Sequence, residues 1–155
     1  MRTLTAFLLA ILTSATAAQE RQLYWDTLDV KARLESDGRL QVEERQRMVF
    51  TGDWNGGERT FNLRPRQQLT FGGMSRTDAQ SGVEIPMSQG SLDEVDRWDF
   101  AEPHRIRWRA RNTFDPAFDN TTITYVLRYA LSNVLLRDNE QYVLDHDFAF
   151  PIERA

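Results

Sequence analysis

Apolar and polar side chains alternate with a period of two along most of this chain. Residues 121–131 are the clearest case, and their apolar face would carry Ile123, Tyr125, Leu127, Tyr129 and Leu131. Successive side chains of a β-strand point to opposite faces, whereas a helix repeats every 3.6 residues. No segment of helical length shows a helical stripe. The sequence therefore predicts a chain built from strands.

The pair Asp37-Gly38 lies between two alternating runs, and Asp-Gly in this position is the strongest short-range hairpin signal. It predicts antiparallel strands over residues 24–34 and 40–50. The first would carry Tyr24, Leu28, Val30, Ala32 and Leu34 on one face. The second would have Leu40, Val42, Met48 and Phe50 in phase with one another.

Further short strands are predicted where alternation recurs between turn signals, at residues 59–63, 67–71, 82–87, 104–111, 121–131 and 142–150. Residues 91–102 are acidic and contain Trp98, and we interpret them as a loop. About eight short strands joined by turns are typical of a β-sandwich of antiparallel sheets, which is the predicted fold.

The first residues have the three parts of a signal peptide. Arg2 is followed by an apolar run over residues 4–12 and then by small residues at Ala15-Thr16-Ala17. The apolar run is shorter than the roughly 20 residues that cross a membrane as a helix. We expect residues 1–18 to be a cleaved signal peptide and residues 19–155 to form one exported domain, periplasmic or at the cell surface.

Composition narrows the possible functions. Cysteine is absent, so neither a disulfide framework nor a thiolate metal site is expected. Lys31 is the only lysine among 19 basic residues, a bias that indicates a GC-rich bacterial genome. The formal net charge of −4 argues against a nucleic-acid-binding protein.

One predicted strand carries a row of like charges. Ile106, Trp108 and Ala110 would share one face, and the other face would carry Arg105, Arg107, Arg109 and Arg111. Such a row requires carboxylates on neighbouring strands or an external anion. Our hypothesis is that these arginines form a partner-binding surface for an envelope protein or an anionic membrane.

Trp54 and Trp98 fall in polar segments, where exposed rings could stack on sugars, whereas Trp108 is in phase with core residues. A cell-envelope carbohydrate-binding module that uses Trp54 and Trp98 is therefore an alternative function.

Candidate metal sites and catalytic groups are weak. On a strand, Asp145 and Asp147 would point away from His146, so one ion could not bind all three and no metal site is predicted. Residues 53–58 have oxygen ligands at alternate positions, which leaves weak calcium binding open.

A carboxylate-based hydrolase is the second alternative, with acids from Asp93, Glu94, Asp96, Asp99 and Glu102. No nucleophile motif, cofactor motif or phosphate-binding loop is present, so the sequence favours a protein that is not an enzyme and has no cofactor.

Four stretches together resemble the N-terminal domain of YciQ-like predicted bacterial membrane proteins. They are residues 34–44 around Asp37-Gly38, residues 50–59 ending in Arg59, residues 124–129 with Tyr125 and Tyr129, and residues 138–144. The similarity runs from about Tyr24 to Phe150. Two features differ, because Thr60-Phe61-Asn62-Leu63 replaces an apolar-Pro pair and Asp145-His146 replaces Trp-Asn.

The resemblance implies an extracytoplasmic β-sandwich followed by membrane helices, so we expect the chain to continue past Ala155 and to be tethered to a membrane. The family has no established activity, and it assigns no catalytic residue. The preferred interpretation is a non-catalytic interaction or sensing domain of a bacterial membrane protein.

Overall fold

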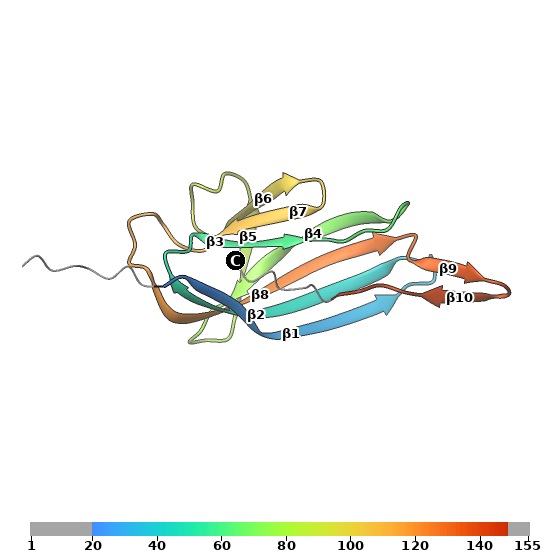
Figure 1. Cartoon of the computed structure of the whole chain (residues 1–155), viewed down its shortest axis with the longest axis horizontal. Helices are drawn as coiled ribbons and strands as arrows, with labels where there is room; N and C mark the ends of the chain where they lie inside the picture. Colours follow the sequence, from blue (N-terminus) through green and yellow to red (C-terminus); the bar gives the residue numbers. More distant parts are fainter. Residues whose placement is uncertain (1–19, 149–155) are drawn as a thin grey trace, which may run out of the picture.

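The computed structural model describes residues 20–148, and all regular structure within them is β (Figure 1). No helix in this part of the chain is long and apolar enough to span a membrane. The strands are β1 (Gln22–Leu34), β2 (Leu40–Gly52), β3 (Gly56–Thr60), β4 (Gln68–Thr77), β5 (Glu84–Gln89), β6 (Arg97–Glu102), β7 (Arg105–Arg109), β8 (Phe118–Ser132), β9 (Leu135–Asp138) and β10 (Gln141–Leu144). The all-β prediction is confirmed.

The predicted hairpin is present as β1 and β2. Gly38 has a φ of 82°, which glycine adopts without strain, and its amide donates to the carbonyl of Glu35 at 3.0 Å. The Asp37 carboxylate accepts from the amide of Arg39 at 3.0 Å. This turn fixes the register in which Leu34 lies opposite Leu40.

Eight strands form one continuous sheet in the order β1-β2-β8-β4-β5-β6-β7-β3. Strand β5 joins the two halves, because Glu84–Met87 pair antiparallel with β4 and Ser88–Gln89 pair parallel with β6. The sheet curls, so that β3, β6 and β7 lie over β2, β4 and β8 (Figure 1). The fold is thus one curled sheet with a parallel contact, together with a two-stranded sheet of β9 and β10, and the predicted sandwich of antiparallel sheets is not confirmed.

The core fills the space between the two halves. The rings of Trp108 on β7 and Tyr125 on β8 are 5.0 Å apart, and Phe61 packs edge-on against Tyr129 at 4.9 Å. The alternating residues of β2 and β8 supply most of the opposing wall, as their sequence pattern predicts. The predicted core position of Trp108 is confirmed.

A β-bulge between Trp25 and Thr27 shifts the phase of β1. Leu23 and Trp25 therefore pack on the core before the bulge, and Val30 packs on it after the bulge. Tyr24 is 39% exposed on the opposite face, which corrects its predicted place beside Leu28. An inserted residue reverses the facing of everything before it.

Three predicted segments also differ. Residues 97–102 are not loop but β6, and β4 runs through the predicted break at Gly72-Gly73 by means of another bulge. The predicted strand over residues 142–150 is shorter, because β10 ends at Leu144 and pairs only with β9. Its last residues lie outside the described part, as does the predicted signal peptide.

Candidate functional site

The side chains of β1, β2, β8 and β4 that point away from the core form what we call the outer face. Its polar residues stand opposite one another across the strands, because the register pairs Lys31 with Glu43, Glu43 with Arg128, and Arg128 with Gly73. Opposite charges on directly facing residues stabilise a sheet. The outer face is therefore a charged surface built by the alternation of four strands.

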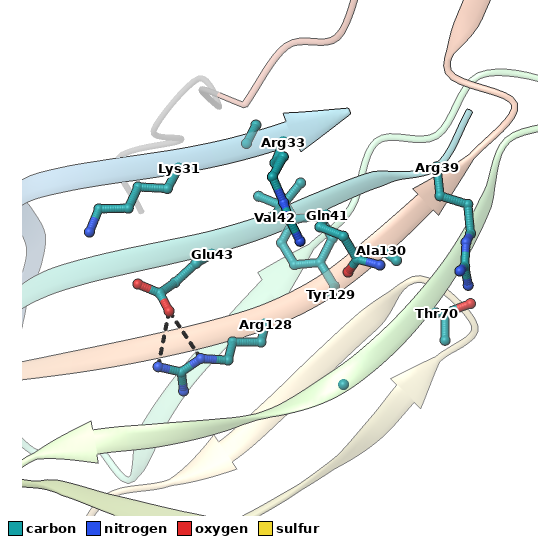
Figure 2. A pocket seen from close by; sticks show the side chains of 12 residues that line it. Lys31, Arg33, Arg39, Gln41, Val42, Glu43, Thr70, Arg128, Tyr129 and Ala130 are labelled. Carbon is teal, nitrogen blue, oxygen red and sulfur yellow. Dashed lines mark hydrogen bonds and ion pairs between the residues drawn. The ribbon is translucent and has the colours of Figure 1, made fainter. Parts of the chain in front are cut away.

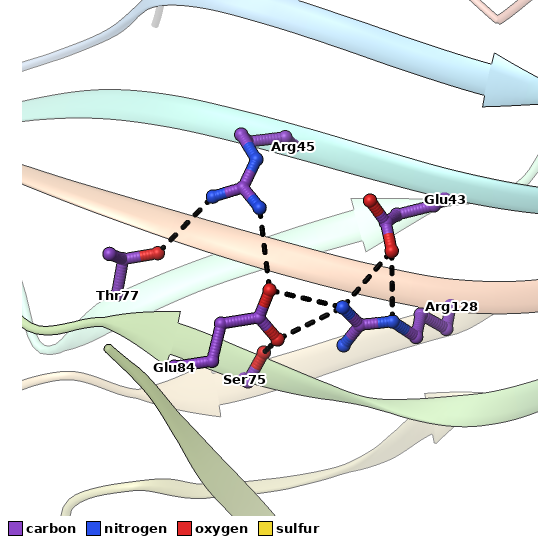
Figure 3. A network of polar contacts seen from close by, with 6 residues as sticks. All are labelled: Glu43, Arg45, Ser75, Thr77, Glu84 and Arg128. Carbon is purple, nitrogen blue, oxygen red and sulfur yellow. Dashed lines mark hydrogen bonds and ion pairs between the residues drawn. The ribbon is translucent and has the colours of Figure 1, made fainter. Parts of the chain in front are cut away.

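Arg128 and Glu84 are the centre of a polar network on this face (Figure 3). The Arg128 guanidinium donates to Glu43 at 3.0 Å and to Glu84 at 3.1 Å, and Ser75 donates to Glu84 at 2.8 Å. Arg45 reaches Glu84 at 3.3 Å. Burial works against the charged form of Glu84, but the hydrogen bonds from Ser75 and Arg128 outweigh it and hold the pKa of Glu84 below its usual value.

Beside this network the outer face has a shallow, open hollow of about 560 Å³ (Figure 2). Arg128 and Glu43 lie at one end, Arg39 and Thr70 at the other, and Arg33 between them. The hollow is lined by Lys31, Ala32, Arg33, Arg39, Gln41, Val42, Glu43, Thr70, Gly72, Arg128, Tyr129 and Ala130. We call this the outer-face hollow.

Small residues create the outer-face hollow. The bulge between Phe71 and Gly73 brings the backbone of Gly72 so close to β8 that a Cβ there would lie 3.2 Å from the carbonyl oxygen of Arg128. Ala130 adds only a methyl group beside it. Bulges are over-represented at sheet edges and next to active sites. The lining offers cationic donors, an amide, a hydroxyl and one carboxylate, which suits polar recognition of an anionic group.

A second polar cluster, which the sequence analysis missed, is buried between the two halves. Glu44 is 0% exposed and accepts from Arg59 at 2.9 and 2.6 Å, from the Tyr129 hydroxyl at 2.5 Å and from the Gln46 amide at 3.0 Å. Burial, together with the charge of Glu44, raises the pKa of Tyr129. The sequence could have indicated this cluster, because alternation along β2 places Glu44 and Gln46 on the same face as the core residues Val42 and Met48.

The predicted arginine row is divided. Strand β7 lies between β3 and β6 and does not neighbour β8. Arg107 pairs with Glu58 of β3 at 2.8 Å, and Arg105 pairs with Glu102. Carboxylates on both flanking strands thus compensate these charges, and binding of a partner by the exposed part of the row stays a prediction.

Arg109 and Arg111 differ from those two. Arg109 donates to the Thr113 hydroxyl at 2.8 Å. Arg111 is only 5% exposed, lies past the end of β7 and bonds to the Asp53 carboxylate and to the carbonyl of Trp54. The prediction that Arg111 shares the exposed face is wrong, because regular alternation ends with β7 at Arg109.

The structure places the two candidate tryptophans differently. Trp98 lies in β6, is 7% exposed and packs against Phe71 at 4.8 Å, so it presents no open ring face for a sugar. Trp54 is half-buried, donates to the carbonyl of Gln22 at 3.1 Å and has the Arg21 guanidinium 4.1 Å from its ring centroid. Carbohydrate binding stays a prediction, and this geometry does not bring the two rings together.

His146 follows β10 and is half-buried against Phe148, with ring centroids 4.6 Å apart. Burial and the positive charges of Arg64 and Arg59 lower the pKa of its imidazole. Asp145 instead pairs with Arg64 at 3.1 Å. Within residues 20–148, no group of three or more His, Cys, Asp or Glu side chains could hold a metal ion.

The acids considered for hydrolysis are engaged separately. Asp96 pairs with Arg76 at 2.6 Å, Glu94 with Arg97, and Glu102 with Arg105. Asp99 accepts from Gln89 at 3.0 Å, and Asp93 accepts from Ser91 at 2.7 Å. These hydrogen bonds hold the carboxylates within the sheet and its turns.

An all-β domain with a charged outer face and a buried Glu–Arg pair is the class that these observations define. Residues 24–150 match the family described as the N-terminal domain of a predicted membrane protein (DUF2207), and the chain belongs to this family. The resemblance found from the motifs is thereby confirmed. No curated protein and no solved structure matches the chain.

Proposed function

We propose that this chain is a non-catalytic, extracytoplasmic interaction or sensing domain of a bacterial membrane protein. Family membership supports the link to a membrane protein. The signal-peptide pattern at residues 1–18 supports export, and the lysine-poor composition supports a bacterial source.

The outer-face hollow is the observation that carries the proposed binding role. Four cationic side chains and one carboxylate line it, and three of those cations belong to exposed ion pairs. Exposed pairs contribute about 0–1 kcal/mol, so an incoming anionic partner can replace them at small cost. Thr70 and Gln41 add neutral hydrogen-bonding groups to this lining.

Site-specific photocrosslinking in the producing cell tests this role. A photoreactive residue at Gln41, inside the outer-face hollow, should yield a crosslinked envelope component that the same residue at Gln80, in the exposed turn after β4, does not yield. The double substitution Arg33→Glu and Arg39→Glu should reduce the product. Identical crosslinking patterns at both positions would argue against the hollow as a binding site.

The compartment is tested by the mature N-terminus. Mass spectrometry of the exported product should find it at Ala18 or Gln19, and protease added outside the cytoplasmic membrane should digest the domain. Recovery of a chain that begins at Met1 would contradict removal of the leader. Turnover of a substrate that single Asp or Glu substitutions abolish would contradict the non-catalytic assignment.

A further inference from the structure

Strand β1 is the first strand of the sheet and has a neighbour on one side only (Figure 1). Residues 27–34 are regular, because the bulge lies before Thr27. The amide of Glu35 bonds to the carbonyl of Arg39, and such bonds alternate along an antiparallel pair. The backbone groups of Leu28, Val30, Ala32 and Leu34 therefore point outward, away from β2.

Two exposed charged side chains on this edge strand form no ion pair within the described residues, although Asp29 faces Arg45 and Lys31 faces Glu43 in the register with β2. In the described part of the chain, Asp29 and Lys31 are the only charged side chains of β1 and β2 without a hydrogen bond or ion pair. Both project on the outer face, two residues apart, on either side of Val30. Their signs are opposite.

The inward side of this edge is incompletely covered. Leu28 and Val30 are half-buried, whereas Ala32 and Leu34 are exposed, and Leu34 is 44% exposed. Another strand beside β1 would extend the apolar layer over these residues. An edge of this length is also the usual place for a further strand to pair.

We propose that β1 pairs antiparallel with β1 of a second copy of this chain, around a twofold axis that passes beside Val30. In this register Val30 faces Val30 of the second copy, and Leu28 faces its Ala32. Asp29 faces Lys31 of the second copy, and Lys31 faces its Asp29. The twofold axis therefore creates two pairs of opposite charges, one on each side of Val30.

Self-complementarity is what selects a second copy as the occupant. An isologous interface must match a surface to itself, and an antiparallel strand pair centred on Val30 does so in main-chain bonds, apolar contacts and charge. The sheets of two copies become one continuous sheet. This inference goes beyond the proposed function, and a negative crosslink at Gln41 would leave it unaffected.

Cysteine substitution tests the register directly, because the chain has no cysteine of its own. Facing Cα atoms of a hydrogen-bonded antiparallel pair are about 5.5 Å apart, within the range that a disulfide spans. Val30→Cys should therefore form a disulfide-linked dimer of the purified chain under mild oxidation. Tyr24→Cys, on the same strand and more exposed, should remain monomeric.

Charge reversal tests the pairing without new covalent bonds. Lys31→Asp or Asp29→Lys alone places two like-charged pairs in the interface and should weaken dimerisation about tenfold or more in sedimentation experiments. The double variant exchanges the two charges and should restore the dimer. Ala32→Pro should abolish it, because proline removes an outward amide while the bonds to β2 remain.

Thermal melting of each variant at a dilution where the wild type is monomeric separates loss of dimer from loss of fold. A monomeric wild type, equal disulfide formation at Val30→Cys and Tyr24→Cys, or a dimer that persists in Ala32→Pro would overturn the proposal. If the free edge binds an extended segment of another protein instead, the wild type will be monomeric and the charge-exchanged double variant will not recover binding of that protein.

Discussion

The carboxylate of Glu44 occupies a position in β2 where its neighbours Val42 and Met48 are apolar core residues. Burying a charge costs several kcal/mol unless it is paired and hydrogen-bonded. Arg59, only 3% exposed, supplies a two-pronged ion pair, and Tyr129 and Gln46 supply further donors. The cluster joins β2, β3 and β8 across the core, so at the scale of single residues it connects the two halves of the curled sheet.

Removing one charge of the Glu44–Arg59 pair should lower the free energy of unfolding much more than removing both charges together. Arg59→Met leaves a buried carboxylate without its cation, and we expect the free energy of unfolding to fall by about 3–5 kcal/mol. Glu44→Gln combined with Arg59→Met removes both charges but keeps an acceptor for Tyr129, so it should regain more than half of that loss. Urea denaturation measures both values. A loss for Arg59→Met within the small range of surface substitutions would contradict this account of the pair.

His146 should make stability depend on pH. Its pKa is lowered from 6.5 in the folded state, chiefly by burial, with Arg64 and Arg59 facing it and Glu44 and Asp147 opposing them. Below pH 6.5 the unfolded chain binds a proton that the folded chain resists, so stability present above that pH is lost as pH falls through the folded pKa. His146→Gln should flatten this part of the stability profile, which urea denaturation at a series of pH values measures. An unchanged slope in His146→Gln would refute the assignment.

At the scale of elements, β3 depends on close contact between backbones. A Cβ at Gly56 would lie 1.8 Å from the carbonyl oxygen of Trp108, and one at Gly57 would lie 2.5 Å from its ring. Neither clash can be relieved by moving a flexible side chain end, since the obstacles are a strand backbone and a buried indole. Both glycines are therefore required for β3 to pair with β7 and to bring Arg59 over the core.

Gly56→Ala should disrupt the pairing of β3 with β7. We expect the free energy of unfolding to fall by about 2 kcal/mol or more, because the backbone of β3 must shift and this shift also disturbs the contacts of Arg59. Thr60→Ala, at the exposed end of the same strand, serves as the control and should change stability by less than about 0.5 kcal/mol. Chemical denaturation provides both values. Equal effects of the two substitutions would show that the glycine contact is unimportant.

The elements that follow regular alternation were predictable, and those that depart from it were not. The β1–β2 hairpin and β8 follow from period two and Asp-Gly. The bulge in β1 displaces Tyr24, and the bulge at Gly72 lets β4 continue, yet neither has a unique sequence signal. The sequence also could not predict which strands pair, because β7 lies beside β3 rather than beside β8, the next strand along the chain. That placement brings Glu58 to Arg107 and decides how the arginine row is compensated.

The candidate site shows the same limit. The sequence places Arg128 and Glu43 on polar faces, but only the register of four strands brings them together with Glu84 and forms the outer-face hollow beside Gly72. Arg111 is buried rather than exposed, because it lies two positions beyond the end of β7, where strand alternation no longer applies. Trp98 failed as a loop residue because burial, not local polarity, determines whether a short acidic segment pairs as a strand.

At the scale of the whole molecule, the main-chain pairing that joins the two halves of the sheet is short. Strand β5 pairs with β6 through Ser88 and Gln89 alone. The bidentate contact of Arg76 on β4 with Asp96, just before β6, adds an ion pair between the halves. Asp96 holds a φ of 62°, a conformation that Asp and Asn tolerate better than most residues. The shared core between the halves must therefore contribute most of the coupling.

A shared core predicts that the halves unfold together. Tryptophan fluorescence follows both halves, because Trp98 and Trp108 lie in β6 and β7 and Trp25 lies in β1, while far-ultraviolet circular dichroism follows all strands. The two signals should give one coincident transition with urea, as two-state domains do. Asp96→Asn removes the ion pair but keeps a residue that tolerates the positive φ. It should lower the free energy of unfolding by about 1 kcal/mol, because the pair is partly exposed, and it should shift the urea midpoints of both signals equally. Asp96→Ala should cost more, because alanine is also strained at a positive φ. Transitions that separate in Asp96→Asn would show that the Arg76–Asp96 contact, rather than the core, couples the two halves.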